Sequence, residues 1–162
     1  MDAESLIIEN RRFDPDRNEV LSTIVADFAR AFGYTARDLD IEPALAQLLR
    51  LRVAQINNCT YCLNLHFEAA RALEIPRAKI DTLSAWWETD LFTDAEQAAL
   101  AYAEALTRVA DTTVTDRFAR YHDELEVHFS ESQIVTIVGV VINMNVWTRL
   151  KLAQGATPTR AH

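Results

Sequence analysis

The sequence has few cysteines, few helix-breaking residues and no long apolar run. Only two cysteines occur among the 162 residues, and only three glycines and four prolines interrupt the chain. Together with common Ala, Leu and Glu, that balance favours helices over strands. The longest apolar run, residues 134–142, is interrupted by Thr136 and is far too short to span a bilayer. We therefore expect a helical protein without a membrane-spanning segment.

Positive charge is also in short supply. The formal net charge is −8 and the sequence pI is about 4.9, which argues against nucleic acid and against an anionic membrane surface as partners. The first residues, Met1-Asp2-Ala3-Glu4, are acidic and lack the apolar core of a signal peptide. We expect a cytoplasmic protein, in which a cysteine pair is more typical of catalysis or metal binding than of a structural disulfide.

Apolar residues make up 49% of the chain and charged residues 25%, as in a globular domain. Apolar positions at helical spacing and two capping boxes predict an all-α fold of about seven helices in one domain. We expect this domain over residues 20–154, after an irregular lead-in (1–19) and before a flexible tail (155–162). Thr115 is a candidate cap for the sixth helix. The apolar residues 134–142 predict a last helix that is buried on all sides, in the core or under a partner subunit. The expected helices begin near residues 19, 43, 59, 76, 93, 115 and 130.

The two cysteines form the motif Cys59-Thr60-Tyr61-Cys62, and His66 follows four residues after the second. Residues four apart share one face of a helix, so the His66 imidazole should lie within reach of the Cys62 sulfur. Asn58 is a reasonable N-cap, which places the cysteines at a helix start. A nearby histidine and a helix N-terminus both favour the thiolate, the reactive form of cysteine. The pattern therefore predicts thiol redox chemistry.

Two other interpretations of the cysteines remain open. Cys59, Cys62 and His66 could be three zinc ligands, with His122, His128 or a carboxylate as the fourth. The cysteines could also be small apolar residues of a buried helix. A thioredoxin fold is not expected, because the segment before the motif predicts a helix where that fold requires strands.

The run from Leu49 to Cys62, followed by His66, resembles the AhpD-like group of the carboxymuconolactone decarboxylase family. The resemblance covers about residues 20–153, and the motif around the cysteines is its most specific part. Supporting segments are residues 85–89, 92–94, 101–107 and 128–131.

This resemblance implies an all-helical fold that assembles as a trimer or hexamer. It also implies peroxide reduction through a dithiol–disulfide cycle that needs no cofactor and no metal ion. By position, Cys62 would attack the hydroperoxide, Cys59 would resolve the intermediate, and His66 would relay protons. An external dithiol or thioredoxin-like protein would restore the thiols. A redox sensor or interaction module that forms the disulfide without turnover is the alternative.

Gln47 departs from the family pattern. The family has a glutamate twelve residues before the first cysteine, which feeds the proton relay, and this chain has Gln47 there. A glutamine can form hydrogen bonds but cannot take up a proton. We further expect Phe67 and the pair Trp86-Trp87 to form the pocket wall, and Arg50 and Arg52 to be solvated or paired with acids.

Overall fold

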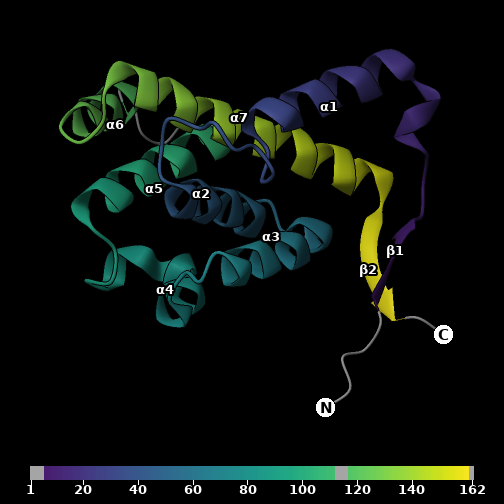
Figure 1. The fold of residues 1–162 in the computed structure, drawn as a ribbon, viewed down its shortest axis with the longest axis horizontal. Helices are drawn as coiled ribbons and strands as arrows, with labels where there is room; N and C mark the ends of the chain where they lie inside the picture. Colours follow the sequence, from purple (N-terminus) through teal and green to yellow (C-terminus); the bar gives the residue numbers. More distant parts are fainter. Residues whose placement is uncertain (1–5, 112–116, 161–162) are drawn as a thin grey trace.

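The computed structural model describes residues 6–111 and 117–160, and this part of the chain is a bundle of seven α-helices (Figure 1). The predicted all-α class is confirmed. Two 3₁₀ turns and a short two-stranded ribbon complete the fold. The elements are β1 (Leu6–Asn10), η1 (Pro15–Arg17), α1 (Glu19–Phe32), α2 (Pro43–Ile56), α3 (Thr60–Ala72), α4 (Arg77–Thr82), η2 (Leu83–Glu88), α5 (Asp94–Thr107), α6 (Arg117–Glu126), α7 (Glu131–Gln154) and β2 (Ala156–Arg160).

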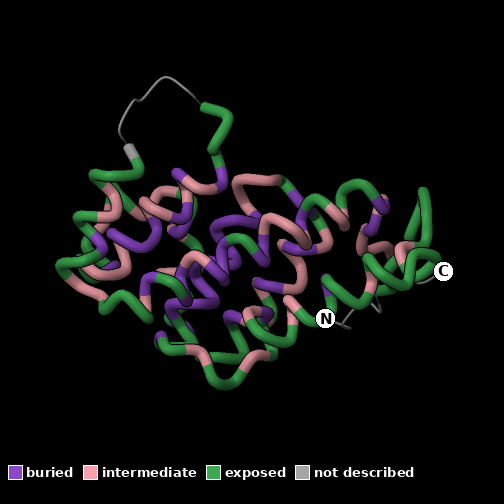
Figure 2. The backbone as a smooth tube through the Cα atoms, turned by 90° about the horizontal axis from the view of Figure 1, so that it is seen from above, coloured by how far each residue is buried: buried purple, intermediate pink, exposed green. Residues whose placement is uncertain are grey.

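Helix α2 is the centre of the bundle. Every residue from Leu45 to Ala54 is buried, and the helix packs against α3, α5 and α7. Figure 2 shows the buried segments gathered in the middle of the molecule, with exposed turns around them. Because α2 is enclosed on all sides, any polar side chain that it carries must find its partner inside the protein.

Three polar side chains of α2 are buried: Gln47, Arg50 and Arg52. Arg52 donates from Nε to Oε1 of Glu104 on α5 at 2.6 Å, so it is paired with an acid as expected. Arg50 is neither solvated nor paired with an acid, which corrects the expectation for this residue. Its Nη2 atom donates to the backbone oxygens of Phe32 and Gly33 at 2.8 and 2.7 Å.

Arg50 therefore fixes the end of α1. The last carbonyls of a helix lack partners within the helix and carry partial negative charge, which a cation satisfies well. A second close contact lies on α7, where a Cβ atom at Gly139 would be 2.4 Å from the Phe32 ring. Glycine at this position lets α1 and α7 approach closely. Arg50 and Gly139 together place the residues that follow α1 beside α3 and α7.

Both predicted capping boxes are present. Thr93 caps α5 with Glu96, and Ser130 caps α7 with Gln133. The cap predicted at Thr115 lies outside the described residues. Gly155 ends α7 with φ of 71°, a left-handed conformation that glycine adopts without strain.

The chain ends are more regular than expected. Strand β1 pairs antiparallel with β2, with Ile8 opposite Pro158, so residues 6–10 are not an irregular lead-in and residues 156–160 are not a frayed tail. The pairing joins the two ends beside α3 (Figure 1). The short apolar segment Leu6-Ile7-Ile8 was the sequence signal for strand β1. Its partner, β2, begins directly after α7, and the sequence shows no strand pattern there.

Helix α7 crosses the whole bundle, and within the single chain it is not buried on all sides. Complete burial in the core is therefore wrong, whereas burial of the exposed part under a partner subunit stays a prediction. Val135 and Ile142 are 61% and 45% exposed, whereas Ile137, Val140 and Val141 are buried. By length and composition α7 could cross a membrane, but half of its most apolar window is buried within the chain, and it packs on α1, α2 and α5.

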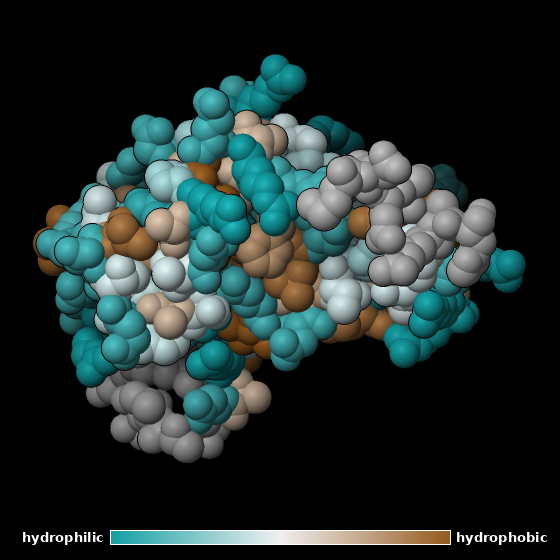
Figure 3. All heavy atoms as spheres, turned by 90° about the horizontal axis from the view of Figure 1, so that it is seen from below, coloured by the Kyte–Doolittle hydropathy of each residue, from teal (hydrophilic) through white to brown (hydrophobic). Residues whose placement is uncertain are grey.

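Apolar side chains are also exposed on α1, where Val20, Leu21 and Ile24 face solvent. On the face drawn in Figure 3, hydrophobic residues appear at several places between hydrophilic ones. Exposed apolar groups on neighbouring helices are typical of surfaces that bind another subunit.

We therefore propose a homo-oligomer whose interface includes α1, and the family resemblance implies that it is a trimer or hexamer. Light scattering at micromolar concentration should give a multiple of the 18.4 kDa chain mass. Ile24→Lys should lower that mass, because a buried unpaired charge is costly at an apolar interface. A monomer mass for the unmodified protein would contradict this expectation.

Candidate active site

The cysteine motif lies at the turn from α2 into α3. Asn58 adopts a positive φ of 51°, a conformation that asparagine tolerates better than most residues. The Nδ2 atom of Asn57 donates to Oδ1 of Asn145 at 3.1 Å and to Oγ1 of Thr148 at 2.9 Å, both on α7. These contacts hold the turn against α7 and fix the start of α3.

The N-cap of α3 is Cys59 and not Asn58, which corrects the expected cap by one residue. The Cys59 sulfur accepts a hydrogen bond from the Cys62 backbone N–H at 3.3 Å. Cys59 and Cys62 are joined by a disulfide, with 5.2 Å between their Cα atoms. Both residues are almost completely buried. The first turn of α3 thus brings the two sulfurs into bonding contact, with the Cys62 backbone N–H group directed at the Cys59 sulfur.

His66 lies one turn further along α3, and Gln47 of α2 holds it. The Gln47 Nε2 atom is 2.9 Å from the His66 backbone oxygen and 3.1 Å from His66 Nδ1. A carbonyl oxygen can only accept, so the amide must present its NH₂ group to both atoms. Nδ1 therefore accepts a hydrogen bond and carries no proton. In the neutral imidazole the proton is then on Nε2.

The surroundings of His66 also keep it uncharged. Burial, and to a lesser degree the Arg50 guanidinium, lower the pKa of His66 from 6.5 to about 3. The Tyr34 ring packs edge-on against the imidazole, with 5.9 Å between ring centroids. A neutral imidazole cannot stabilise a thiolate by charge. In this disulfide form His66 is therefore a neutral imidazole with its proton on Nε2, and its role as a proton relay for the thiol form stays a prediction.

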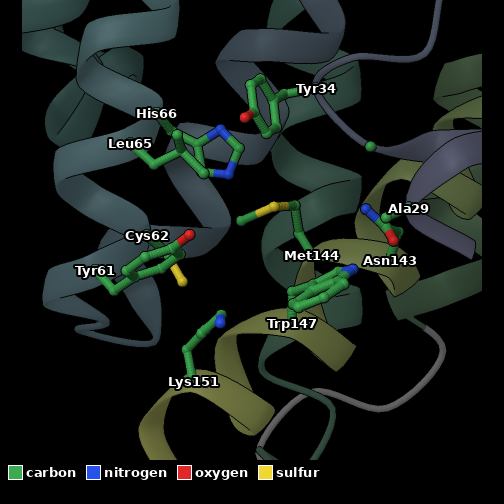
Figure 4. Close-up of a pocket in the computed structure, with 11 residues that line it drawn as sticks. Ala29, Tyr34, Tyr61, Cys62, Leu65, His66, Asn143, Met144, Trp147 and Lys151 are labelled. Atoms are coloured by element: carbon green, nitrogen blue, oxygen red, sulfur yellow. The ribbon is translucent and has the colours of Figure 1, made fainter. Parts of the chain in front are cut away.

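Cys62 and His66 line a cavity of about 230 Å³ between α1, α3 and α7 (Figure 4). Cys59 does not line it. The walls are mostly apolar or aromatic and come from three elements that are distant in sequence. The other lining residues are Ala29, Gly33, Tyr34, Tyr61, Leu65, Asn143, Met144, Trp147 and Lys151.

Lys151 is the cation of this cavity. Its ammonium group lies 4.8 Å from the Tyr61 ring centroid and 5.5 Å from that of Trp147, and it donates to Gln154 Oε1 at 3.2 Å. Burial lowers the pKa of Lys151, while Asp16 opposes this shift. Burial raises the pKa of Tyr61, and Tyr34 adds to that shift. Figure 4 shows the Lys151 amine directed into the cavity on the side of Tyr61 and Cys62.

The structure brings the four predicted site residues together: Cys59, Cys62, His66 and Gln47. The residues predicted for the pocket wall do not line the cavity. Trp86 donates from Nε1 to Glu104 at 2.9 Å, and Trp87 stacks near Arg52, away from the cysteines. The residues that sequence reasoning missed are Tyr34, Asn143, Trp147 and Lys151. Asn143 was detectable as a polar residue within the apolar last helix, whereas Tyr34 lies in a loop and has no sequence signal.

Zinc ligands do not gather at the cysteines. Across residues 6–111 and 117–160, no group of three or more His, Cys, Asp or Glu side chains is arranged to hold a metal ion. His122 pairs with Glu126 on its own helix at 3.3 Å, and His128 lies next to Phe129. Neither histidine lines the cavity with Cys62, so the described residues offer no fourth ligand there.

The chain is thus a helical thiol protein. Its C-x-x-C pair lies at a helix start, next to a small and mostly apolar cavity. Residues 24–105 match the carboxymuconolactone decarboxylase family model. The uncharacterized protein YdfG of Bacillus subtilis is 34% identical over 109 residues, which cover 67% of this chain and 72% of YdfG. The chain belongs to the carboxymuconolactone decarboxylase family.

Solved structures share the fold. A protein of unknown function from Agrobacterium tumefaciens, named as a candidate antioxidant defence protein AhpD, superposes with a TM-score of 0.78. It is 24% identical, and the match covers 91% of this chain and 96% of that one. The debrominase Bmp8, solved with 2,3,4-tribromopyrrole, gives a TM-score of 0.74 at 19% identity, covering 88% and 72%. The fold therefore carries enzymes, and it does not by itself select one reaction.

The buried neutral state of His66 predicts a specific dependence of stability on pH. Its pKa is lower in the folded protein than in the unfolded chain, so the unfolded chain binds more protons between about pH 6.5 and about pH 3. Stability should therefore fall as pH decreases through this window, by up to about 1.4 kcal/mol per pH unit from this group.

The matched control is His66→Gln, which keeps a polar side chain but does not titrate. Urea unfolding between about pH 4 and pH 7 should show a smaller pH slope for this variant than for the unmodified protein. Equal slopes would mean that His66 is protonated in the folded protein at the same pH as in the unfolded chain.

Proposed function

We propose that the protein is a thiol-dependent peroxidase that reduces organic hydroperoxides through a Cys59–Cys62 dithiol–disulfide cycle. The observation that carries the proposal is the different exposure of the two sulfurs to the cavity. Cys62 lines it together with His66, whereas Cys59 lies behind, in bonding contact with Cys62. This is the arrangement that an attacking and a resolving cysteine require. The kinship with AhpD-like proteins supports it.

The cycle begins with the Cys62 thiolate. It attacks the terminal oxygen of the hydroperoxide, the O–O bond breaks, and the alkoxide leaves and takes up a proton to become the alcohol. Cys62 is then a sulfenic acid. The Cys59 thiolate attacks the Cys62 sulfur, and hydroxide leaves and becomes water as it takes up a proton. An external dithiol then reduces the disulfide by exchange and is itself oxidised.

The surrounding residues have separate roles in this scheme. Lys151 supplies the positive charge that favours the Cys62 thiolate, because His66 is neutral. In the disulfide form the Cys62 backbone N–H group donates to the Cys59 sulfur. The same hydrogen bond stabilises Cys59 when it is a thiolate. His66, with its proton on Nε2, donates a hydrogen bond to the departing oxygen.

The site also suggests the setting in which the protein works. A buried disulfide that must be reopened in each cycle requires a reducing compartment and a partner with its own dithiol. We place the protein in the cytoplasm, with a thioredoxin-like protein or small dithiol as reductant. The competing proposal, a redox sensor, uses the same disulfide but forms it once and consumes no further peroxide.

Thiol counting and intact mass measure this chemistry directly. One equivalent of cumene hydroperoxide added to the reduced protein should remove two thiols and two hydrogens. Cys59→Ser should instead gain one oxygen on Cys62, because the sulfenic acid has no resolving thiol. Cys62→Ser should remain unchanged.

With excess dithiol present, the unmodified protein should consume many equivalents of the hydroperoxide. Consumption that stops after one equivalent identifies a sensor. Oxidation of Cys59 in the Cys62→Ser protein, as fast as in the unmodified protein, would reverse the assignment of the two cysteines.

Gln47 limits the proposed activity, because an amide that donates to Nδ1 prevents His66 from taking a proton there. Gln47→Glu would place a carboxylate at this position, which accepts a hydrogen bond from Nδ1–H and raises the pKa of His66. Nε2 then becomes free to accept the thiol proton. We expect peroxide turnover to increase at least about tenfold, within the range of general acid–base catalysis.

The substitution should also lower stability, since a carboxylate oxygen would face the His66 carbonyl where an N–H group now donates. Gln47→Met, of similar size but without a hydrogen-bonding group, is the matched control and should not gain activity. If Gln47→Glu is no faster than the unmodified protein at any pH from about 6 to 9, the account of this position is wrong.

A further inference from the structure

Lys151 brings a positive charge to a cavity whose wall is otherwise uncharged. Among the described residues that line the cavity, it alone carries a formal charge, because His66 is neutral. No lining residue within 6–111 and 117–160 is Asp or Glu. A charge in apolar surroundings is costly unless an opposite charge or hydrogen bonds compensate it. The cavity therefore favours an anionic ligand over a neutral one of the same shape.

The partners of the Lys151 ammonium group within the chain leave room for such a ligand. An ammonium group has three N–H donors, and one of them donates to Gln154 Oε1 at 3.2 Å. Asp16 raises the pKa of Lys151 through its charge, but no carboxylate of residues 6–111 and 117–160 forms an ion pair with it. Two N–H donors thus remain for a group that enters the cavity.

The ammonium group is also accessible from the cavity. Lys151 is only partly buried, and Figure 4 shows its amine directed into the cavity on the side of Tyr61 and Cys62. The rings of Tyr61 and Trp147 flank it, with centroids at 4.8 and 5.5 Å from Nζ. Two aromatic rings limit the positions that the flexible lysine side chain can take. The charge is therefore held at one end of the cavity, with apolar wall residues such as Met144 beyond it.

The single lysine limits the charge of the ligand. A phosphate group carries about −1.5 to −2 charges near pH 7, so it would bring uncompensated negative charge into an apolar cavity. A carboxylate carries one negative charge, which Lys151 neutralises, and its two oxygens can accept from the two remaining N–H donors. The cavity therefore favours a monocarboxylate over a phosphate.

The size of the cavity limits the rest of the ligand. Its volume of about 230 Å³ exceeds the roughly 150 Å³ of an engineered cavity that binds benzene. It falls below the range of about 300–1,000 Å³ that is typical for drug-sized ligands. One ring with short substituents fills a space of this size.

We propose that the cavity binds a single-ring or similarly compact apolar molecule with one carboxylate group, and that this carboxylate pairs with Lys151. The carboxylate site rests on the position of Lys151 and on the uncharged wall around it. Its dependence on redox state rests on the proposed function, in which Lys151 also neutralises the Cys62 thiolate. The disulfide form has no thiolate, so it should bind the carboxylate more tightly than the dithiol form does.

Binding to the disulfide form of the full-length protein tests the carboxylate site without turnover. The probes for titration calorimetry at about pH 7 are benzoate, benzamide and phenyl phosphate. Benzamide has the shape of benzoate without its charge, and phenyl phosphate carries more charge. Benzoate should bind at least about tenfold more tightly than either of the others, because a hydrogen bond to a charged group contributes about 1.5–3 kcal/mol.

Two variants with the same change of net charge locate the preference. Lys151→Met keeps an apolar side chain of similar length and should bring the benzoate to benzamide ratio close to one, while benzamide affinity changes little. Arg149→Met is the matched control. Arg149 is exposed, donates to Asn145 and does not line the cavity, so its replacement should keep the ratio.

Equal affinity of the unmodified protein for benzoate and benzamide would overturn the proposal. A preference that persists in Lys151→Met would also overturn it, because the carboxylate would then bind elsewhere. So would a preference that disappears in Arg149→Met, since only the overall charge of the protein would then matter. Tighter binding of phenyl phosphate than of benzoate would identify a phosphate site instead of a carboxylate site.

The dithiol form and the peroxidase assay separate this proposal from the proposed function. Equal benzoate affinity in the disulfide and dithiol forms would refute the pairing of Lys151 with the Cys62 thiolate, but not the carboxylate site. A protein without peroxide turnover that prefers benzoate refutes the proposed reaction alone. A protein that turns over peroxide but shows no preference for benzoate refutes the carboxylate site alone.

Discussion

The burial of α2 is the constraint on which the rest of the structure depends. A helix enclosed on every side leaves no solvent for its polar side chains, yet this one carries Gln47, Arg50 and Arg52. Each side chain reaches a different neighbour: α3, the end of α1, and α5. Removing any one of these partners would leave a buried polar group unsatisfied. The contacts that hold the bundle together therefore also set the positions of the site residues.

The contact of Gln47 connects this constraint to chemistry. One NH₂ group serves both the His66 carbonyl oxygen and Nδ1, so the orientation of the amide and the tautomer of the imidazole are determined together. Arg50 acts on the same histidine in two ways. It contributes to the low pKa of His66 through its charge, and it fixes the end of α1, next to which Tyr34 packs on the imidazole ring. The result is a neutral donor beside Cys62, with Lys151 as the nearby cation of the cavity.

Much of the fold and the centre of the site could be predicted from the sequence, for local reasons. The capping boxes at Thr93 and Ser130 and the spacing of Cys59, Cys62 and His66 act within one or two helical turns, so they are visible in a single segment. The terminal ribbon and the cavity wall depend on contacts between distant segments. Asn143, Trp147 and Lys151 line the same cavity as Cys62 only because α7 crosses the bundle beside α3. Trp86 and Trp87 were plausible wall residues by composition, but Glu104 and Arg52 hold them elsewhere.

The central claim, that Gln47 holds His66 as the neutral tautomer with its proton on Nε2, can be observed directly. Long-range ¹H–¹⁵N correlation spectra of histidine-labelled protein distinguish protonated from unprotonated ring nitrogens. The account predicts that Nδ1 of His66 is an unprotonated acceptor and Nε2 is protonated, with no change between about pH 5 and pH 8. A protonated Nδ1, or titration of His66 near its usual pKa of about 6.5, would contradict it.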